Sequence, residues 1–108
     1  MSLYADYMSE VYGKNVIENE SSIVVWTMKD DIFYLEDIYI KPDLRDQGLG
    51  KKFMELIVQI AKNNGCTKLL GSITLLNKYR DENMMKFLKY GFSLHSLSDN
   101  IIYMIKDI

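Results

Sequence analysis

The chain has 108 residues, 48% of them hydrophobic and 26% charged, which suits one domain with one core over residues 1–108. Its apolar runs are short, as at Ile23-Val24-Val25-Trp26, and fall far below the roughly 18 residues that cross a bilayer, so we expect no membrane span. With a net charge of −2 and no dense stripe of Lys and Arg, the chain is not expected to bind nucleic acid.

The N-terminal sequence and the cysteine content indicate a cytoplasmic protein. The N-terminus lacks the basic segment, apolar stretch and cleavage site of a secretory signal. Cys66 is the single cysteine, and with the single histidine, His95, it offers too few ligands for a structural zinc site. We therefore expect no metal and no internal disulfide, and we interpret Cys66 as a small buried residue.

Charge is divided unevenly along the chain. Residues 1–40 hold two basic and eight acidic side chains, whereas residues 41–108 hold eleven basic and seven acidic ones. This favours a cationic ligand on the first part and an anionic ligand on the second.

The first part predicts a helix and two strands. Apolar residues at positions 4, 7, 8 and 11 have helical spacing, and Gly13 can close a helix over 3–13. Two segments rich in β-branched and aromatic residues, about 22–28 and 32–40, predict strands joined by a tight hairpin. Pro42 cannot continue the ladder and ends the second strand near Lys41.

The second part predicts helix, strand, helix and hairpin. One apolar stripe runs from Gly48 to Asn64 and a buried strand covers 67–75, so strand, helix and strand form a right-handed parallel crossover. A shorter helix over about 81–90 has Asp81 as its expected N-cap and Gly91 as its end. The segments 92–95 and 100–106 form a closing antiparallel hairpin.

A glycine motif lies between the second strand and the long helix, with the sequence Arg45-Asp46-Gln47-Gly48-Leu49-Gly50 followed by Lys51. Backbone amides and the helix dipole favour an anion there, so a diphosphate suits this place. Gly48 lets phosphate oxygens approach the backbone, Gly50 eases entry into the first helical turn, and Arg45 and Lys51 add positive charge. A strand-to-helix turn without a ligand would accept the same glycines.

The order of these features resembles the GCN5-related N-acetyltransferases (the GNAT family) over about residues 20–106. The glycine motif follows a strand that ends at Pro42, and a late helix closes on Gly91-Phe92. The resemblance implies an α/β fold with a mixed, mostly antiparallel sheet, a parallel βαβ crossover and flanking helices. It also implies an acetyl transfer from acetyl-CoA to a primary amine.

The resemblance places the cofactor as well. Backbone amides from Gln47 to Lys51 would hold the pyrophosphate of acetyl-CoA, and the main chain of Ile38, Tyr39 and Ile40 would pair with its pantetheine arm. The thioester would lie between residues 38–40 and 73–75. Asn77 and Asn83 would reach the pantetheine.

Glu36 is the candidate general base. Strand alternation predicts Tyr34, Glu36, Ile38 and Ile40 on one face, with Leu35, Asp37 and Tyr39 on the other. The segment Phe33–Asp37 is similar to the corresponding strand of the polyamine acetyltransferases, in which the glutamate serves the acceptor amine. The alternative is a solvated acidic pair on a sheet edge.

One position departs from the family pattern. Many members carry a tyrosine general acid four residues before the glycine of the Gly-Phe pair, and Phe87 stands there. We therefore name Tyr79 and Tyr90 as candidate acids, although both also suit an ordinary structural role. Arg80 likewise replaces the family's asparagine at the start of this helix.

The segment before the first strand is short for the family, with one helix where members commonly have a strand and two helices. The acceptor site is therefore open, suited to a protein acceptor or completed by a second subunit, so we expect a homodimer. The alternative functions are a catalytically silent CoA-binding regulatory or interaction module, and an unrelated small α/β protein.

Overall fold

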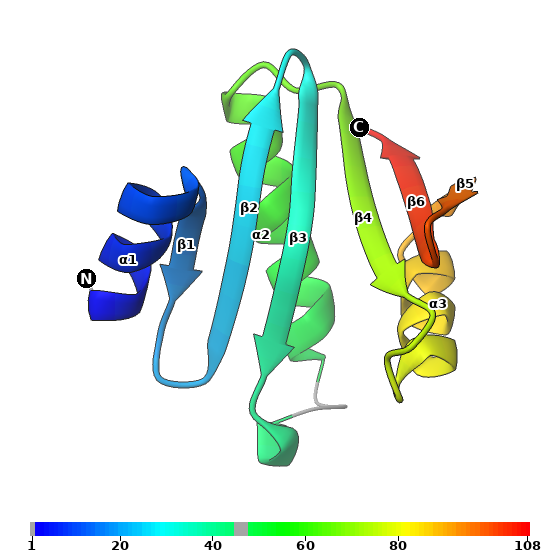
Figure 1. Cartoon of the computed structure of the whole chain (residues 1–108), viewed down its shortest axis with the longest axis horizontal. Coiled ribbons are helices and arrows are strands. Elements are labelled where there is room, and N and C mark those ends of the chain that lie inside the picture. Colours follow the sequence, from blue (N-terminus) through cyan, green and yellow to red (C-terminus); the bar gives the residue numbers. More distant parts are fainter. Residues whose placement is uncertain (1, 45–47) are drawn as a thin grey trace.

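The computed structural model describes residues 2–44 and 48–108, which form a six-stranded sheet in the order β1-β2-β3-β4-β6-β5 (Figure 1). Strands β3 and β4 are parallel and every other neighbouring pair is antiparallel. The predicted mixed sheet with one parallel crossover is confirmed. The elements are α1 Leu3–Tyr12, β1 Asn15–Glu18, β2 Ser22–Lys29, β3 Ile32–Ile40, a 3-10 turn Pro42–Leu44, α2 Leu49–Asn63, β4 Lys68–Thr74, α3 Arg80–Lys89, β5 Ser93–Ser98 and β6 Ile101–Asp107.

Helices α2 and α3 both pack against β4, and α2 lies behind β2 and β3 (Figure 1). They cover a core of fully buried side chains, among which Phe33, Ile57 and Leu69 are the largest. Burying each such side chain contributes about 1.5–3 kcal/mol, so this layer accounts for most of the fold's apolar stabilisation. None of the helices in the described residues is long and apolar enough to cross a membrane.

Helix α1 forms as predicted but does not bury its apolar stripe. Ser2 caps it by accepting a hydrogen bond from the Ala5 amide at 3.0 Å, and Gly13 ends it with a positive φ of 66°. None of its residues is buried, and Tyr7 and Val11 are about half exposed. The stripe that predicted the helix therefore stays about half exposed.

The prediction missed strand β1. Its four residues pair antiparallel with β2, from Asn15 opposite Trp26 to Glu18 opposite Ile23. A strand with only two apolar residues gives no readable alternation, so its formation depends on the neighbouring edge of β2.

Strand β3 contains a β-bulge at Glu36. The register shifts there, because Trp26 lies opposite Leu35 while Val25 lies opposite Asp37. Past the bulge, Ile38 lies opposite the fully buried Val24.

Directly opposite residues share a face of the sheet, so Ile38 shares the face of Leu35. The predicted alternation, with Tyr34 and Ile38 on one face and Leu35 on the other, is therefore wrong beyond Glu36. The extra residue in β3 turns the rest of the strand over.

Strands β3 and β4 pair only at their starts. Their parallel ladder runs from Ile32 opposite Lys68 to Leu35 opposite Gly71. Strand β3 then continues to Ile40 and β4 to Thr74, and the two strands diverge (Figure 1). We call the place where the ladder ends the apex of the splayed strands.

The last helix begins differently from the prediction. Its N-cap is Tyr79, which makes no capping hydrogen bond, whereas the expected cap Asp81 lies in the first turn and binds Arg80 at 3.1 Å. The predicted hairpin is present and longer than expected, with a two-residue turn at Asp99 and Asn100. Both turn residues have positive φ, as a type I′ turn requires.

Candidate functional site

The described part of the glycine motif begins helix α2. Gly48 is its N-cap with a positive φ of 79°, and a Cβ placed on it would meet no atom within 4 Å. The motif residues Arg45, Asp46 and Gln47 lie outside the described residues. Leu49, Gly50 and Lys51 form the first turn, whose amides have no partner inside the helix and which carries the positive end of its dipole. Gly48 thus leaves open space beside a helix terminus suited to an anion.

Gly50 has a packing role that the sequence did not indicate. A Cβ there would lie 2.6 Å from the hydroxyl oxygen of Tyr90, so a larger residue would make the end of the Tyr90 side chain shift. The carbonyl of Tyr90 accepts a hydrogen bond from Lys106. The candidate acid Tyr90 is therefore a part-buried residue that places its hydroxyl against the first turn of α2.

Glu36 lies at the apex and is held there by an ion pair. It is the bulge residue just beyond the last residue of β3 that pairs with β4, and its Oε1 lies 2.9 Å from the Nζ of Lys14. The two side chains are 33% and 32% exposed. Glu36 and its neighbour Asp37 are both exposed residues, but the Glu36 carboxylate is held in an ion pair.

Phe87 lies at the same apex. Two of its ring carbons lie 2.5 and 2.6 Å from where a Cβ added to Gly71 would be. Gly71 is the last residue of β4 that pairs with β3. Its ring makes an edge-to-face contact with Phe92, with centroids 4.8 Å apart. The residue that replaces the family's tyrosine is thus fixed where the strands part, and it has no hydroxyl to donate a proton.

The second candidate acid, Tyr79, lies in the turn between β4 and α3. It is 43% exposed, and the Lys78 amine is 4.9 Å from the centre of its ring. The Oδ1 of Asn77 accepts a hydrogen bond from the Tyr79 amide at 2.8 Å. Asn77 therefore shapes this turn, while Asn83 lies half-buried on α3.

The three residues predicted to meet the pantetheine occupy the diverging end of β3. Ile38 and Tyr39 are exposed, and Ile40 is half-buried. The structure thus places Glu36, Phe87 and these three residues around the splayed strands.

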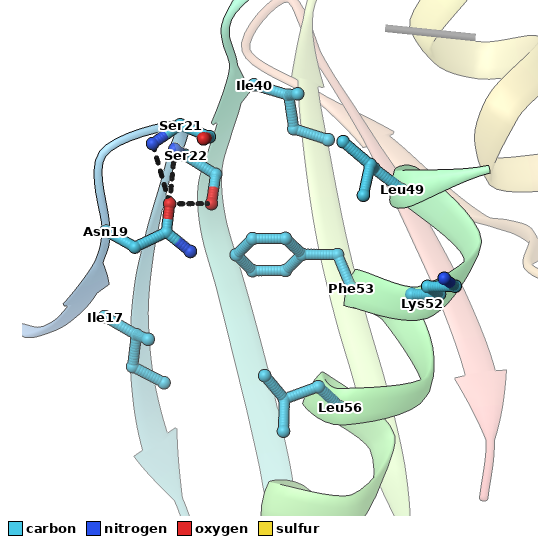
Figure 2. A pocket seen from close by; sticks show the side chains of 9 residues that line it. All are labelled: Ile17, Asn19, Ser21, Ser22, Ile40, Leu49, Lys52, Phe53 and Leu56. Atoms are coloured by element: carbon cyan, nitrogen blue, oxygen red, sulfur yellow. Dashed lines mark hydrogen bonds between the residues drawn. The ribbon is translucent and has the colours of Figure 1, made fainter. Parts of the chain in front are cut away.

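A cavity of about 280 Å³ lies beside the end of β3, between α2 and the turn that joins β1 and β2 (Figure 2). On one wall of the cavity, the Oδ1 of Asn19 accepts hydrogen bonds from the amides of Ser21 and Ser22 at 2.7 and 3.0 Å. No motif in the sequence indicated it, because its lining comes from distant segments. The lining residues are Ile17, Asn19, Ser21, Ser22, Ile40, Leu49, Lys52, Phe53 and Leu56.

Comparison with known proteins identifies the family. The family model described as "Acetyltransferase (GNAT) family" matches residues 13–92. The chain belongs to the GNAT acetyltransferase family, as its sequence resemblance predicted.

The chain is also similar to curated sequences and, in its fold, to solved structures. A thialysine N-epsilon-acetyltransferase from Bos taurus is 40% identical over 52 residues, which cover 48% of this chain and 31% of that protein. A GNAT family acetyltransferase from Elizabethkingia anophelis with acetyl-CoA bound superposes with a TM-score of 0.74 at 15% identity, covering 98% of this chain and 82% of that one. The PaiA N-acetyltransferase of Thermoplasma acidophilum, in complex with coenzyme A, gives 0.73 at 16% identity, covering 82% and 54%.

These structural likenesses confirm the fold. The chain spans about a third of the length of the curated relatives that it matches.

Proposed function

We propose that the chain transfers an acetyl group from acetyl-CoA to a primary amine. The observation that carries the proposal is the splay of β3 and β4, which opens beyond Leu35 and Gly71 next to the first turn of α2. A narrow, partly peptide-like ligand arm fits between diverging strands, and its phosphates fit the helix terminus. The relatives crystallised with acetyl-CoA and with coenzyme A share this fold.

In this proposal the amides from Gln47 to Lys51 hold the pyrophosphate, with Arg45 and Asp46 completing the glycine motif. The main chain from Ile38 to Ile40 pairs with the pantetheine, and Asn77 and Asn83 lie at its other side. The open space at Gly48 supports the first assignment. The exposure of Ile38 supports the second.

Glu36 acts as the general base that takes a proton from the acceptor amine. An attacking amine must be neutral, and a carboxylate held beside the thioester can remove its proton directly or through one water. The position of Glu36 at the apex supports this role. Tyr79 and Tyr90 remain the candidate acids, and comparing Tyr79→Phe with Tyr90→Phe would separate them.

The acceptor is proposed to be a cationic primary amine, either a small molecule or a protein side chain. The acidic character of residues 1–40 supports a cationic acceptor. The relatives' name, thialysine N-epsilon-acetyltransferase, describes an amine of this kind for those proteins.

Residues 1–108 are proposed to form a single acyltransferase-like domain that works in the cytoplasm as a homodimer. The half-exposed apolar stripe of α1 supports association, because it leaves Tyr7 and Val11 partly uncovered on one helix. Light scattering would test this, and a monomer mass at all concentrations would contradict it.

A second candidate function, a silent CoA-binding module, is favoured by Phe87 alone. It predicts binding of acetyl-CoA without transfer to any amine. The experiment below separates it from the first.

The transfer is tested by following free thiol release from acetyl-CoA with thialysine and with other primary amines. We expect Glu36→Gln to lower kcat by roughly 100-fold or more with little change in acetyl-CoA binding. The matched control is Asp37→Asn, which removes the neighbouring carboxylate and should retain most activity. Binding without thiol release would favour the silent module, and equal losses in both variants would contradict the role of Glu36.

A further inference from the structure

The ion pair of Glu36 with Lys14 differs from the other ion pairs among the described residues. Lys68 with Asp107 and Arg80 with Asp81 join carboxylates that are 85% and 87% exposed, so water screens them. Lys14 and Glu36 are instead both about two-thirds covered. Such a pair holds its two groups in one geometry more firmly than a surface pair.

The backbone on both sides of Lys14 fixes the position of this residue. Its amide donates to the Met8 carbonyl at 3.1 Å, as part of the turn through Gly13 that ends α1. The next residue, Asn15, already pairs with Trp26 in the sheet. Lys14 is thus fixed from both sides, and its side chain reaches past β2 to the bulge residue of β3.

The amine of Lys14 therefore lies beside the carboxylate that the proposed function makes the general base. It is a primary amine, the chemical class of the acceptor, and it lies at hydrogen-bond distance from the proposed base. An internal amine at such a place reacts as if it were present at very high concentration.

We propose that Lys14 is itself an acetylation site, modified by its own domain; this rests on the proposed function. Glu36 takes one proton from the Lys14 ammonium, and the neutral Nζ then attacks the thioester carbonyl carbon. The C–S bond breaks as the new amide forms, the sulfur takes the second proton from nitrogen, and the proton on Glu36 passes to water. The products are acetyl-lysine, free coenzyme A and one proton.

Acetylation of Lys14 also changes the site. It removes the positive charge and so abolishes the ion pair. Glu36 is then available to an outside amine, so the unmodified lysine acts as a competitor of the acceptor.

The test incubates the full chain with acetyl-CoA and no added amine, followed by intact mass and peptide mapping. We expect one acetyl group on Lys14, formed at a rate per molecule that does not depend on protein concentration. Lys68 is the matched control, because its Nζ also lies 2.9 Å from a carboxylate, but in an exposed pair with Asp107 rather than with the proposed base. It should be modified at least about tenfold more slowly.

Two variants make the result decisive. Glu36→Gln should abolish the preference for Lys14 while still binding acetyl-CoA in calorimetry. Lys14→Arg keeps the ion pair and cannot be acetylated, so its mass should stay unchanged.

Equal modification of Lys14 and Lys68, or no effect of Glu36→Gln, would overturn self-acetylation. If outside amines are acetylated and Lys14 is not, self-acetylation fails and the proposed function stands. If acetyl-CoA does not bind, both fail.

Discussion

The middle of the sheet and its β1 edge differ in how their residues are covered. Around β4, helices α2 and α3 lie over fully buried side chains such as Leu69 and Met104. At the β1 edge, α1 and β1 contain no buried residue. The covered middle fixes the position of the proposed cofactor site, whereas the uncovered edge leaves the acceptor side accessible. These two regions should therefore respond differently to substitution.

The largest expected difference lies in stability. Phe33→Ala removes a fully buried ring that stacks on Trp26 with ring centroids 4.6 Å apart. It should lower the free energy of unfolding by about 3–5 kcal/mol. Leu3→Ala in α1 removes a side chain that is 86% exposed, and it should change stability by less than about 0.5 kcal/mol. Urea unfolding of both variants checks this, and similar losses would contradict the division.

The next effect concerns the apex itself. A Cβ in Gly71→Ala would lie 2.5 Å from a carbon of Phe87, so the ring must move, at a cost of about 1–3 kcal/mol. In a Phe87→Ala background the same change should cost less than about 0.5 kcal/mol, which a double-mutant cycle in urea would measure. A penalty that stays the same in both backgrounds would show that the ring does not lie on Gly71.

A smaller effect is expected at the N-terminus of α1. Ser2→Ala removes the hydroxyl that accepts from the Ala5 amide, and such a cap is worth about 1 kcal/mol. Because α1 contributes no buried side chain, part of this loss should appear as fraying of α1 alone. Amide exchange would detect faster exchange in residues 3–12 and unchanged exchange in α2; faster exchange throughout would contradict the independence of α1.

The smallest expected effect concerns the reactivity of the Cys66 thiol. Burial raises the pKa of the Cys66 thiol, and the negative charge of Asp31 raises it further. Because the pKa of Cys66 is higher in the folded than in the unfolded protein, the protonated thiol contributes to the free energy of unfolding. This contribution is fully present below the unfolded pKa and is lost as the pH rises through the folded pKa. Near pH 7, a thiol reagent should react about tenfold more slowly with the native protein than with the protein in urea. Equal rates would show that Cys66 is exposed.

The sequence predicted the covered middle of the sheet well and the details of the site less well. The apolar stripe of α2 is a strong periodic signal and β3 is rich in isoleucine and aromatic residues, so the crossover could be predicted directly. The bulge could not, because Glu36 fits an alternating strand and is displaced only by pairing with β2. Its ion pair with Lys14 joins residues far apart in the chain, which no local pattern reports.

The glycine motif shows the same limit on a smaller scale. Gly48 has the positive φ and open surroundings that its proposed role requires. Gly50 was interpreted as easing entry into the helix, and it also gives room to the Tyr90 hydroxyl from the end of α3. A local motif thus predicted neither this contact nor its partner.

The central claim is that the first turn of α2 holds the phosphates of acetyl-CoA. Calorimetric titration with acetyl-CoA should compare the wild type with Gly48→Trp, whose side chain would fill the open space. Gly65→Trp is the matched control, because Gly65 has a φ of 78° and no atom near its Cβ position, yet lies just beyond the other end of α2. We predict micromolar binding by the wild type and the control and its loss in Gly48→Trp; equal binding by both variants, or none by the wild type, would contradict the claim.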